Sequence, residues 1–243
     1  MTDSISKFRR TCILLSGGIG TRLGASCPKQ YLEVCGKPII EYTLECIKAW
    51  AEMDSILIVA DQNWHEYLEE IVLRVISKDV CFLGFAGPGK NRQLSILNAL
   101  KAIENKMTTD SVVMIHDGVR PRLSAQLLKR CNEAIGQSDG VMPFLPVKDT
   151  VYLKDENDNL CGMIRRDSLA AGQTPEFFDY WKYLKANEAL SEEEILTING
   201  SSEPAVLSKM KISLIPGDEG NFKITTPADL ERFTAIIMGA ETV

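Results

Sequence analysis

Residues 11–24 read TCILLSGGIGTRLG, a short apolar run that leads directly into a glycine-rich loop. The apolar part has no polar face, which is typical of a parallel strand covered by helices on both sides. A glycine loop at the carboxyl end of a first strand is where open α/β sheets bind nucleotides, because backbone N–H groups can approach phosphate oxygens there. This stretch therefore predicts both an α/β fold and the position of a ligand site.

The common phosphate-loop fingerprints do not fit this loop. From Gly18 the glycines are spaced G-x-G-x-x-x-G, whereas dinucleotide folds use G-x-G-x-x-G, and no Gly-Lys-Ser/Thr sequence marks a P-loop. Two cations, Arg22 and Lys29, follow the glycines. Their alternative interpretation is solvated loop charge, but their placement just after a glycine loop favours phosphate binding.

Strand-like and helix-like segments alternate over the first 145 residues, which is the pattern of βαβ units. The predicted strands are 11–16, 55–60, 80–85, 111–116 and 140–144, and the predicted helices are 39–49, 64–76, 93–104 and 125–135. Together they predict a three-layer α/β/α, Rossmann-like fold with a mostly parallel sheet.

This alternation breaks after residue 143. Segments 147–154 and 160–164 alternate apolar with polar residues around the turn-rich stretch 155–159, a pattern typical of a β-hairpin. We expect an arm at 144–172 that protrudes and forms a dimer interface; the alternative is an arm that covers its own body. The remaining predictions are a helix at 177–189, strands at 211–215 and 222–224, and a closing helix at 227–238, all in one domain spanning 1–243.

The composition restricts the class of partner. Lys and Arg total 27 against 33 Asp and Glu, and this net charge of -6 disfavours a nucleic-acid protein but not a binder of small anions. Seven scattered cysteines without a C-x-x-C pair are typical of reduced cytoplasmic thiols. The sequence shows no signal peptide, and no apolar run approaches the ~20 residues that cross a bilayer. We therefore expect a cytoplasmic protein with no nucleic-acid or membrane partner.

Six ordered motifs resemble those of the cytidylyltransferases of 2-C-methyl-D-erythritol 4-phosphate and ribitol 5-phosphate, within the sugar-nucleotide nucleotidyltransferases. They are LSGGIGTR at 15–22, PKQY at 28–31 with GKPI at 36–39, R-x-x-S-I-x-N at 92–98, HDGVRP at 116–121, KDT at 148–150 with QTP at 173–175, and NFKIT at 221–225. The resemblance implies transfer of CMP from CTP to a polyol phosphate with release of pyrophosphate. It also implies a Mg²⁺ cofactor and a homodimer formed through the arm.

The resemblance also assigns residue roles. It implies catalytic roles for Arg22, Lys29 and Lys223, which would grip the phosphates around the reacting centre. It implies nucleotide binding by Gly17, Gly18, Gly20, Gly89, Arg92 and Ser95, with Gly89 and Ser95 reading cytosine. It implies acceptor binding by Asp117, Arg120, Thr150, Arg166, Thr174 and Thr197, those on the arm acting across the dimer interface. For Arg166, the alternative is a charged strand edge that discourages aggregation.

Asp117 and His116 end an apolar strand, where an α/β sheet exposes functional groups. A carboxylate beside a triphosphate is unfavourable unless it binds Mg²⁺ or accepts hydrogen bonds from acceptor hydroxyls. Asp117 is therefore also the predicted metal ligand, with a helix N-cap as its alternative. His116 is interpreted as a strand-end histidine satisfied by the backbone, without a chemical role.

One region departs from the resembled pattern. The family's Thr-Asp pair before the helix that precedes the last strand is missing; Thr197 is its best counterpart by sequence context, and Asn199 by spacing from Lys223. Gly118 and segment 189–197 look more like the ribitol-phosphate branch. The alternatives are the methylerythritol enzyme specifically, another donor or acceptor such as UTP or a sugar 1-phosphate, and a non-catalytic nucleotide-binding homologue.

Overall fold

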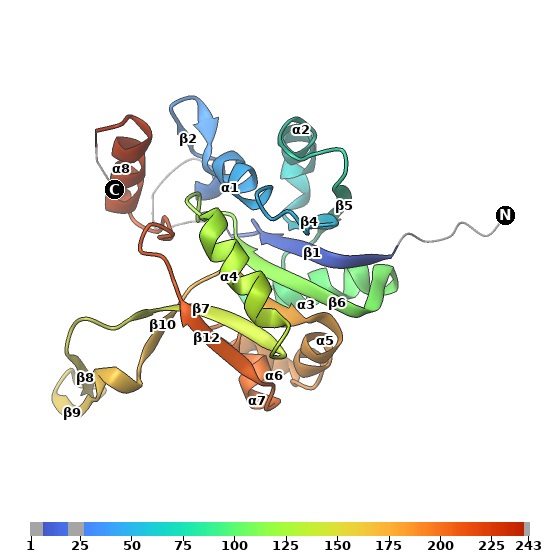
Figure 1. Ribbon diagram of the computed structural model, residues 1–243. Helices are drawn as coiled ribbons and strands as arrows, with labels where there is room; N and C mark the ends of the chain where they lie inside the picture. The colour runs from blue at the N-terminus through green and yellow to red at the C-terminus, as the bar shows by residue number, and fades with distance from the viewer. Residues whose placement is uncertain (1–6, 19–26, 241–243) are drawn as a thin grey trace.

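The computed structural model of the chain (Figure 1) describes residues 7–18 and 27–240. Within them, one eight-stranded sheet runs in the order β10-β7-β11-β6-β1-β4-β5, and β12 also pairs with β7. Its strands are β1 (Phe8–Leu15), β4 (Ser55–Val59), β5 (Cys81–Ala86), β6 (Met107–Asp117), β7 (Gly140–Pro146), β10 (Ala170–Gly172), β11 (Glu176–Asp179) and β12 (Ile212–Pro216). The pairs β1 with β4, β1 with β6, β4 with β5 and β12 with β7 are parallel, whereas β10 and β11 pair antiparallel with their neighbours.

Helices cover both faces of this sheet. On one face, Cys12 and Leu14 of β1 share a core with α1 (Ile39–Ile47), α2 (His65–Val75) and α4 (Ala125–Ile135). On the other face, Ile13 shares a core with α3 (Arg92–Ile103) and α5 (Tyr180–Glu188). Successive strand side chains point to opposite faces, so the uninterrupted apolar run of β1 supplies both cores. The predicted three-layer sandwich with a mostly parallel sheet is confirmed.

The prediction of a helix over 177–189 is wrong at its start. Residues Glu176–Asp179 form β11, antiparallel between β6 and β7, and α5 begins only at Tyr180. Phe177 and Phe178 are fully buried in the two different cores. Burial on both faces of a sheet therefore overrides the local helical pattern. The strand carries Glu176 into the interior opposite Ile115 of β6.

The predicted hairpin is confirmed. Strands β8 (Val151–Lys154) and β9 (Leu160–Ile164) pair antiparallel, and Figure 1 shows them standing away from the sheet and its helices. A second small hairpin, which sequence reasoning missed, joins β2 (Glu33–Val34) to β3 (Lys37–Pro38). The β8–β9 hairpin thus protrudes from the body of the fold, as expected from the sequence.

The C-terminal third contains two short helices that sequence reasoning missed, α6 (Glu192–Thr197) and α7 (Glu203–Leu207). Helix α8 (Pro227–Ile237) begins as predicted, with Thr226 as its N-cap and Pro227 in its first turn. The predicted strand at 222–224 is wrong, because this segment joins no sheet in the described chain. No helix among residues 7–18 and 27–240 is both long and apolar enough to cross a membrane.

Candidate active site

A cavity of about 770 Å³ opens at the carboxyl end of the parallel strands. Segments that follow β1, β4, β5 and β6 form its wall, together with the stretch before α8. The predicted site residues on this wall are Gly17, Gly18, Lys29, Gly89, Arg92, Ser95, Asp117 and Lys223. The site therefore lies where the first strand and its glycine loop predicted it, because parallel strands expose their carboxyl ends at one edge of the sheet.

The start of the glycine loop is braced by the PKQY motif. The Gln30 side-chain amide donates to the carbonyls of Ser16 at 2.6 Å and Gly18 at 2.9 Å. The Tyr31 hydroxyl lies 3.0 Å from the Ser16 hydroxyl. A side chain at Gly17 would place its Cβ only 2.6 Å from Cβ of Pro88, so this approach to the β5–α3 loop requires glycine. Gly20 and Arg22 of the same loop lie outside the described residues.

Lys29 is brought to the segment around Lys223, although nearly the whole chain separates them in sequence. Lys29 begins a 3₁₀ turn over Lys29–Tyr31, and its Nζ donates to the carbonyl of Ile224 at 2.8 Å. Lys223 directs its Nζ to Oδ2 of Asp117 at 3.0 Å. Two of the three predicted catalytic cations thus face the same cavity from opposite ends of the sequence.

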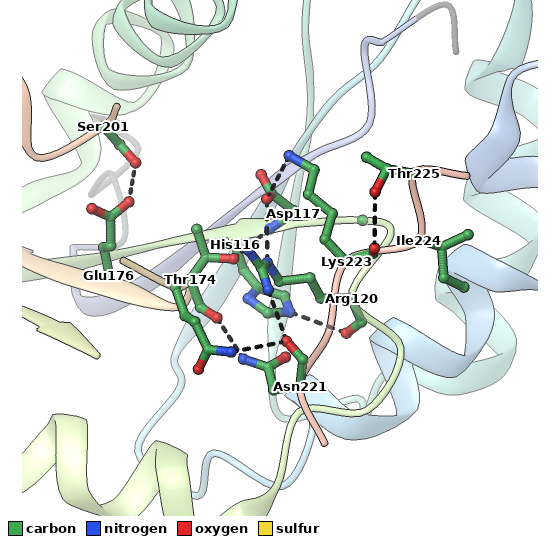
Figure 2. A network of polar contacts seen from close by, with 12 residues as sticks. His116, Asp117, Arg120, Thr174, Glu176, Ser201, Asn221, Lys223, Ile224 and Thr225 are labelled. Atoms are coloured by element: carbon green, nitrogen blue, oxygen red, sulfur yellow. Dashed lines mark hydrogen bonds and ion pairs between the residues drawn. The ribbon is translucent and has the colours of Figure 1, made fainter. Parts of the chain in front are cut away.

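Asp117 sits at the centre of a group of cations (Figure 2). Its Oδ1 accepts from Arg92, with Nη2 at 3.0 Å, while its Oδ2 faces Lys223 and also Nε of Arg120 at 3.4 Å. Burial by itself raises the pKa of Asp117, but the charges of Arg92, Lys223 and Arg120 outweigh it and hold that pKa well below its usual range. The carboxylate is therefore ionised and organises the surrounding cations.

This arrangement does not favour the predicted binding of Mg²⁺ by Asp117. Both of its carboxylate oxygens are already directed at cationic side chains, which leaves the group poorly suited to accept a divalent cation. Within the residues that the structure describes, no cluster of three or more Asp, Glu, His or Cys side chains could hold a metal ion. The donor set therefore does not fit a Mg²⁺ held by the protein.

Arg92, at the first position of α3, connects Asp117 on the cavity wall to the buried Ser201 behind it. Its Nε and Nη2 bond to Asp117, and its Nη1 donates to the Ser201 hydroxyl at 2.7 Å. The side chain keeps 29% of its area exposed and lines the cavity. Sequence reasoning assigned Arg92 to the nucleotide loop, whereas its contacts join it to Asp117, a predicted acceptor residue.

Ser95 and Gly89 shape the loop between β5 and α3. The Ser95 hydroxyl accepts from the Gly89 N–H at 2.9 Å and donates to the Asn91 carbonyl at 2.9 Å. A side chain at Gly89 would bring its Cβ within 2.4 Å of Cβ of Leu94. Asn91 caps α3 by accepting from the Leu94 N–H at 2.8 Å. The hydroxyl proton of Ser95 is thus bonded to the loop itself.

The floor beneath Asp117 is a buried polar layer, shown in Figure 2. Arg120 donates to the Asn221 carbonyl at 2.8 Å, and the Asn221 side chain donates to the Thr174 carbonyl at 2.7 Å. The Thr174 hydroxyl accepts from the Asp117 N–H at 3.4 Å. Burial lowers the pKa of His116 to about 4, so this histidine is neutral at pH 7. Its Nε2 lies 3.4 Å from the Arg120 carbonyl, but its buried Nδ1 has no hydrogen-bond partner among the described residues, so the backbone satisfies only one ring nitrogen.

Three predicted acceptor residues lie outside both the cavity wall and this buried layer within one chain. Thr150 and Arg166 lie exposed on the arm, where Arg166 donates to the Lys148 carbonyl at 3.1 Å. Thr197 is exposed at the end of α6 and donates to the Glu194 carbonyl. Thr197 thus lies away from the cavity wall, whereas Ser201 and Ser202 are the residues immediately before α7, the helix that precedes the last strand.

Sequence reasoning missed Glu176 and Ser201. Glu176 is buried on β11 and accepts hydrogen bonds from the hydroxyls of Ser201 and Ser202. The available signals were a carboxylate inside the apolar run PEFF and a Ser-Ser pair before a Glu-Pro helix start. Their meaning depended on recognising β11 as a strand.

Comparisons with known proteins agree with the site. The family model described as IspD, 2-C-methyl-D-erythritol 4-phosphate cytidylyltransferase, matches residues 11–239. A ribitol-5-phosphate cytidylyltransferase of Lactiplantibacillus plantarum is 30% identical over 227 residues, covering 92% of this chain and 96% of that protein. A 2-C-methyl-D-erythritol 4-phosphate cytidylyltransferase of Geotalea uraniireducens is 34% identical over 225 residues, covering 92% of this chain and 94% of the relative.

A similar solved structure is the 4-diphosphocytidyl-2C-methyl-D-erythritol synthase of Anaerococcus prevotii. It aligns with a TM-score of 0.79 and 25% identity over 96% of both chains. The fold, the cationic cavity and the match of the family model to almost the whole sequence agree. This chain belongs to the IspD family of cytidylyltransferases.

Proposed function

We propose that this protein transfers CMP from CTP to a phosphorylated sugar alcohol. An oxygen of the acceptor phosphate attacks the α-phosphorus, the bond from that phosphorus to its bridging oxygen breaks, and pyrophosphate leaves with the electron pair. Such a transfer needs positive charge around the phosphates more than it needs proton transfer. The observation that carries the proposal is the convergence of Lys29, Arg92 and Lys223 on one cavity beside the buried carboxylate of Asp117.

We assign the charge-stabilising roles to Lys29 and Lys223, which would neutralise the pentacovalent transition state and the leaving pyrophosphate. The role of Arg22 rests on its sequence motif alone. Asp117 keeps Lys223 and Arg120 in place, and Arg120 and Thr174, which both contact Asp117, would bind the acceptor. Mg²⁺ would enter with CTP, held by triphosphate oxygens, since the carboxylate of Asp117 already faces cations.

We place the triphosphate over Gly17 and Gly18, together with Gly20 from the sequence motif, and cytosine against the loop that contains Gly89. Backbone N–H and carbonyl groups of this loop can read the amine and carbonyl groups of the base. Ser95 would fix the loop shape through its bonds to Gly89 and Asn91. The N-terminus of α3, which follows the loop, adds a favourable dipole for anions.

We infer that ribitol 5-phosphate is the acceptor, with 2-C-methyl-D-erythritol 4-phosphate as the second candidate. The support is the ribitol-like sequence around Gly118 and 189–197, together with the similarity to a ribitol-5-phosphate cytidylyltransferase. Pyrophosphate release should be measured with CTP and Mg²⁺ against ribitol, methylerythritol, glycerol and sugar phosphates, and with UTP in place of CTP. A higher kcat/KM for methylerythritol phosphate would overturn the first choice. Tight CTP binding without turnover would favour a non-catalytic homologue.

We also propose that residues 1–243 form one nucleotidyltransferase domain whose arm, 144–172, joins two copies. Strands β8 and β9 expose Tyr152, Leu160 and Met163, an apolar surface unusual for a free hairpin. Thr150 and Arg166 would then reach the cavity of the partner. This composite site would act in the cytoplasm, where all seven unpaired cysteines stay reduced.

The dimer is tested with the double variant Leu160→Glu and Met163→Glu. Sedimentation should show a monomer, and turnover should fall by more than about tenfold because the arm no longer completes the partner's site. Leu73→Glu, at an equally exposed leucine of α2, is the matched control and should stay dimeric and active. A fully active monomer would contradict the composite site.

A further inference from the structure

Glu176 is a buried carboxylate to which the proposed transfer gives no role. It lies on the central strand β11 with 4% of its area exposed. In the described parts of the chain it forms no salt bridge, and its two oxygens instead accept from the hydroxyls of Ser201 and Ser202 (Figure 2 shows the Ser201 contact). Burial raises the pKa of Glu176, while the charge of Arg92 and the two serine hydroxyls oppose that rise. A carboxyl group in such a place calls for an explanation, because burying it without an ion-pair partner is unfavourable.

Ser201 links this carboxylate to the cavity. Its hydroxyl donates to Glu176 and accepts from Nη1 of Arg92 at 2.7 Å. Its carbonyl accepts from the Tyr183 hydroxyl at 2.7 Å, which fixes the backbone at the same residue. A carboxylate can only accept hydrogen bonds, so it orients the Ser201 proton toward itself and the oxygen lone pair toward Arg92.

Arg92 is thereby held from two sides. Asp117 accepts from its Nε and Nη2, and Ser201 accepts from its Nη1. The planar guanidinium carries five N–H groups in a rigid fork, so fixing both ends leaves its other N–H groups with one orientation at the cavity wall. Without the bond to Ser201, the guanidinium could turn about its contact with Asp117. A preoriented cation binds an anion more tightly than one that must be ordered during binding.

We propose that Glu176 is a positioning residue, which acts through the Ser201 hydroxyl to fix Arg92 against Asp117 at the acceptor end of the cavity. The remaining N–H groups of Arg92 then meet the phosphate or hydroxyls of the polyol phosphate. This inference rests on the proposed function and deepens it, since it assigns specificity for the acceptor to a residue that does not touch it. The acceptor end is inferred from Asp117, Arg120 and Thr174, three residues whose motifs imply acceptor binding and of which Arg120 and Thr174 both contact Asp117.

The first test separates the two substrates kinetically. Glu176→Gln keeps the side-chain size and removes the charge, so KM for the polyol phosphate should rise about tenfold while KM for CTP changes less than about twofold. Glu41→Gln is the matched control, because Glu41 is also buried but pairs with Arg74 between α1 and α2, away from the cavity. Equal changes in both KM values, or none, would overturn the proposal.

The second test isolates the hydroxyl of Ser201. Threonine and valine have nearly the same volume and shape, so Ser201→Thr and Ser201→Val disturb packing alike and differ in the hydroxyl. The valine variant should show the raised acceptor KM, and the threonine variant should keep a value near that of the native protein. Identical acceptor KM values in the two variants would refute the link, and this pair remains informative even if Glu176→Gln fails to fold.

The third test needs no acceptor. In protein labelled with [¹⁵N]arginine, the Arg92 side-chain signals, assigned by comparison with Arg92→Lys, should show slow N–H exchange in the native protein and in Ser201→Thr. Ser201→Val and Glu176→Gln should lose this protection. If no polyol phosphate supports turnover, the proposed function fails while these spectra still decide the positioning. Unchanged Arg92 signals in Ser201→Val would overturn the positioning role of Glu176.

Discussion

Replacing Asp117 by asparagine tests whether this carboxylate holds the site together. The side chain is buried and faces Arg92 at 3.0 Å, Lys223 at 3.0 Å and Arg120 at 3.4 Å. Removing one partner of a buried ion pair costs about 3–5 kcal/mol, because the remaining charges lose their compensation. The side chains of Arg92 and Lys223 are 29% and 36% exposed, so water screens them and the lower value of about 3 kcal/mol applies.

Urea unfolding measures this loss. With a slope of about 3 kcal/mol per molar urea for a chain of this size, the unfolding midpoint of Asp117→Asn should fall by about 1 M at pH 7. Turnover should fall as well, because Lys223 loses the partner that directs its Nζ. Asp110→Asn is the control: its pair with Arg9 is exposed, and the midpoint should stay close to that of the native protein.

The pH dependence of the unfolding free energy tests the role of Asp117 independently. The cations hold the pKa of Asp117 well below its usual value, so its stabilisation is fully present above the unfolded pKa of about 3.9 and is lost as pH falls through the folded value. The difference in urea midpoint between the native protein and Asp117→Asn should therefore be largest near neutral pH and should become smaller in acid. Equal midpoints at pH 7, together with native turnover, would refute the reasoning.

Three further predictions follow from the same geometry. Lys29→Ala should lower kcat by about 10²–10³ in a pyrophosphate-release assay, since it removes charge beside the transferred phosphate, and near-normal turnover would exclude that role. Gly89→Ala should weaken CTP binding measured by calorimetry, because the added Cβ would lie 2.4 Å from Cβ of Leu94. Gly87→Ala is the control: its added Cβ would meet no atom within 4 Å, and CTP binding should be unchanged. Burial lowers the pKa of His116 to about 4, so from about pH 6.5 down to 4 the unfolded chain binds a proton that the native state does not. The unfolding free energy should fall by about 1.4 kcal/mol per pH unit in that range. The urea midpoints at pH 7 and pH 5 should therefore differ less for His116→Asn than for the native protein.

The sequence was sufficient wherever the pattern is local. The apolar run before the glycine loop predicted a strand buried on both faces, and 155–159 between two alternating segments predicted the β8–β9 hairpin. Thr226 and Pro227 marked the start of α8. Each of these signals depends on the period of one element or on the chemistry of one turn, which neighbouring residues determine by themselves.

The tertiary structure decided which of these residues meet. Asp117 is surrounded by Arg92, Arg120 and Lys223 because four segments end at one edge of the sheet, and no spacing in the sequence encodes that arrangement. The segment around Glu176 had a helical pattern, yet pairing with β6 and β7 made it a strand. That pairing buried a carboxylate beneath Ser201 and Arg92. The sequence by itself thus determined the fold class and the cations of the site, whereas long-range strand register and burial decided their partners.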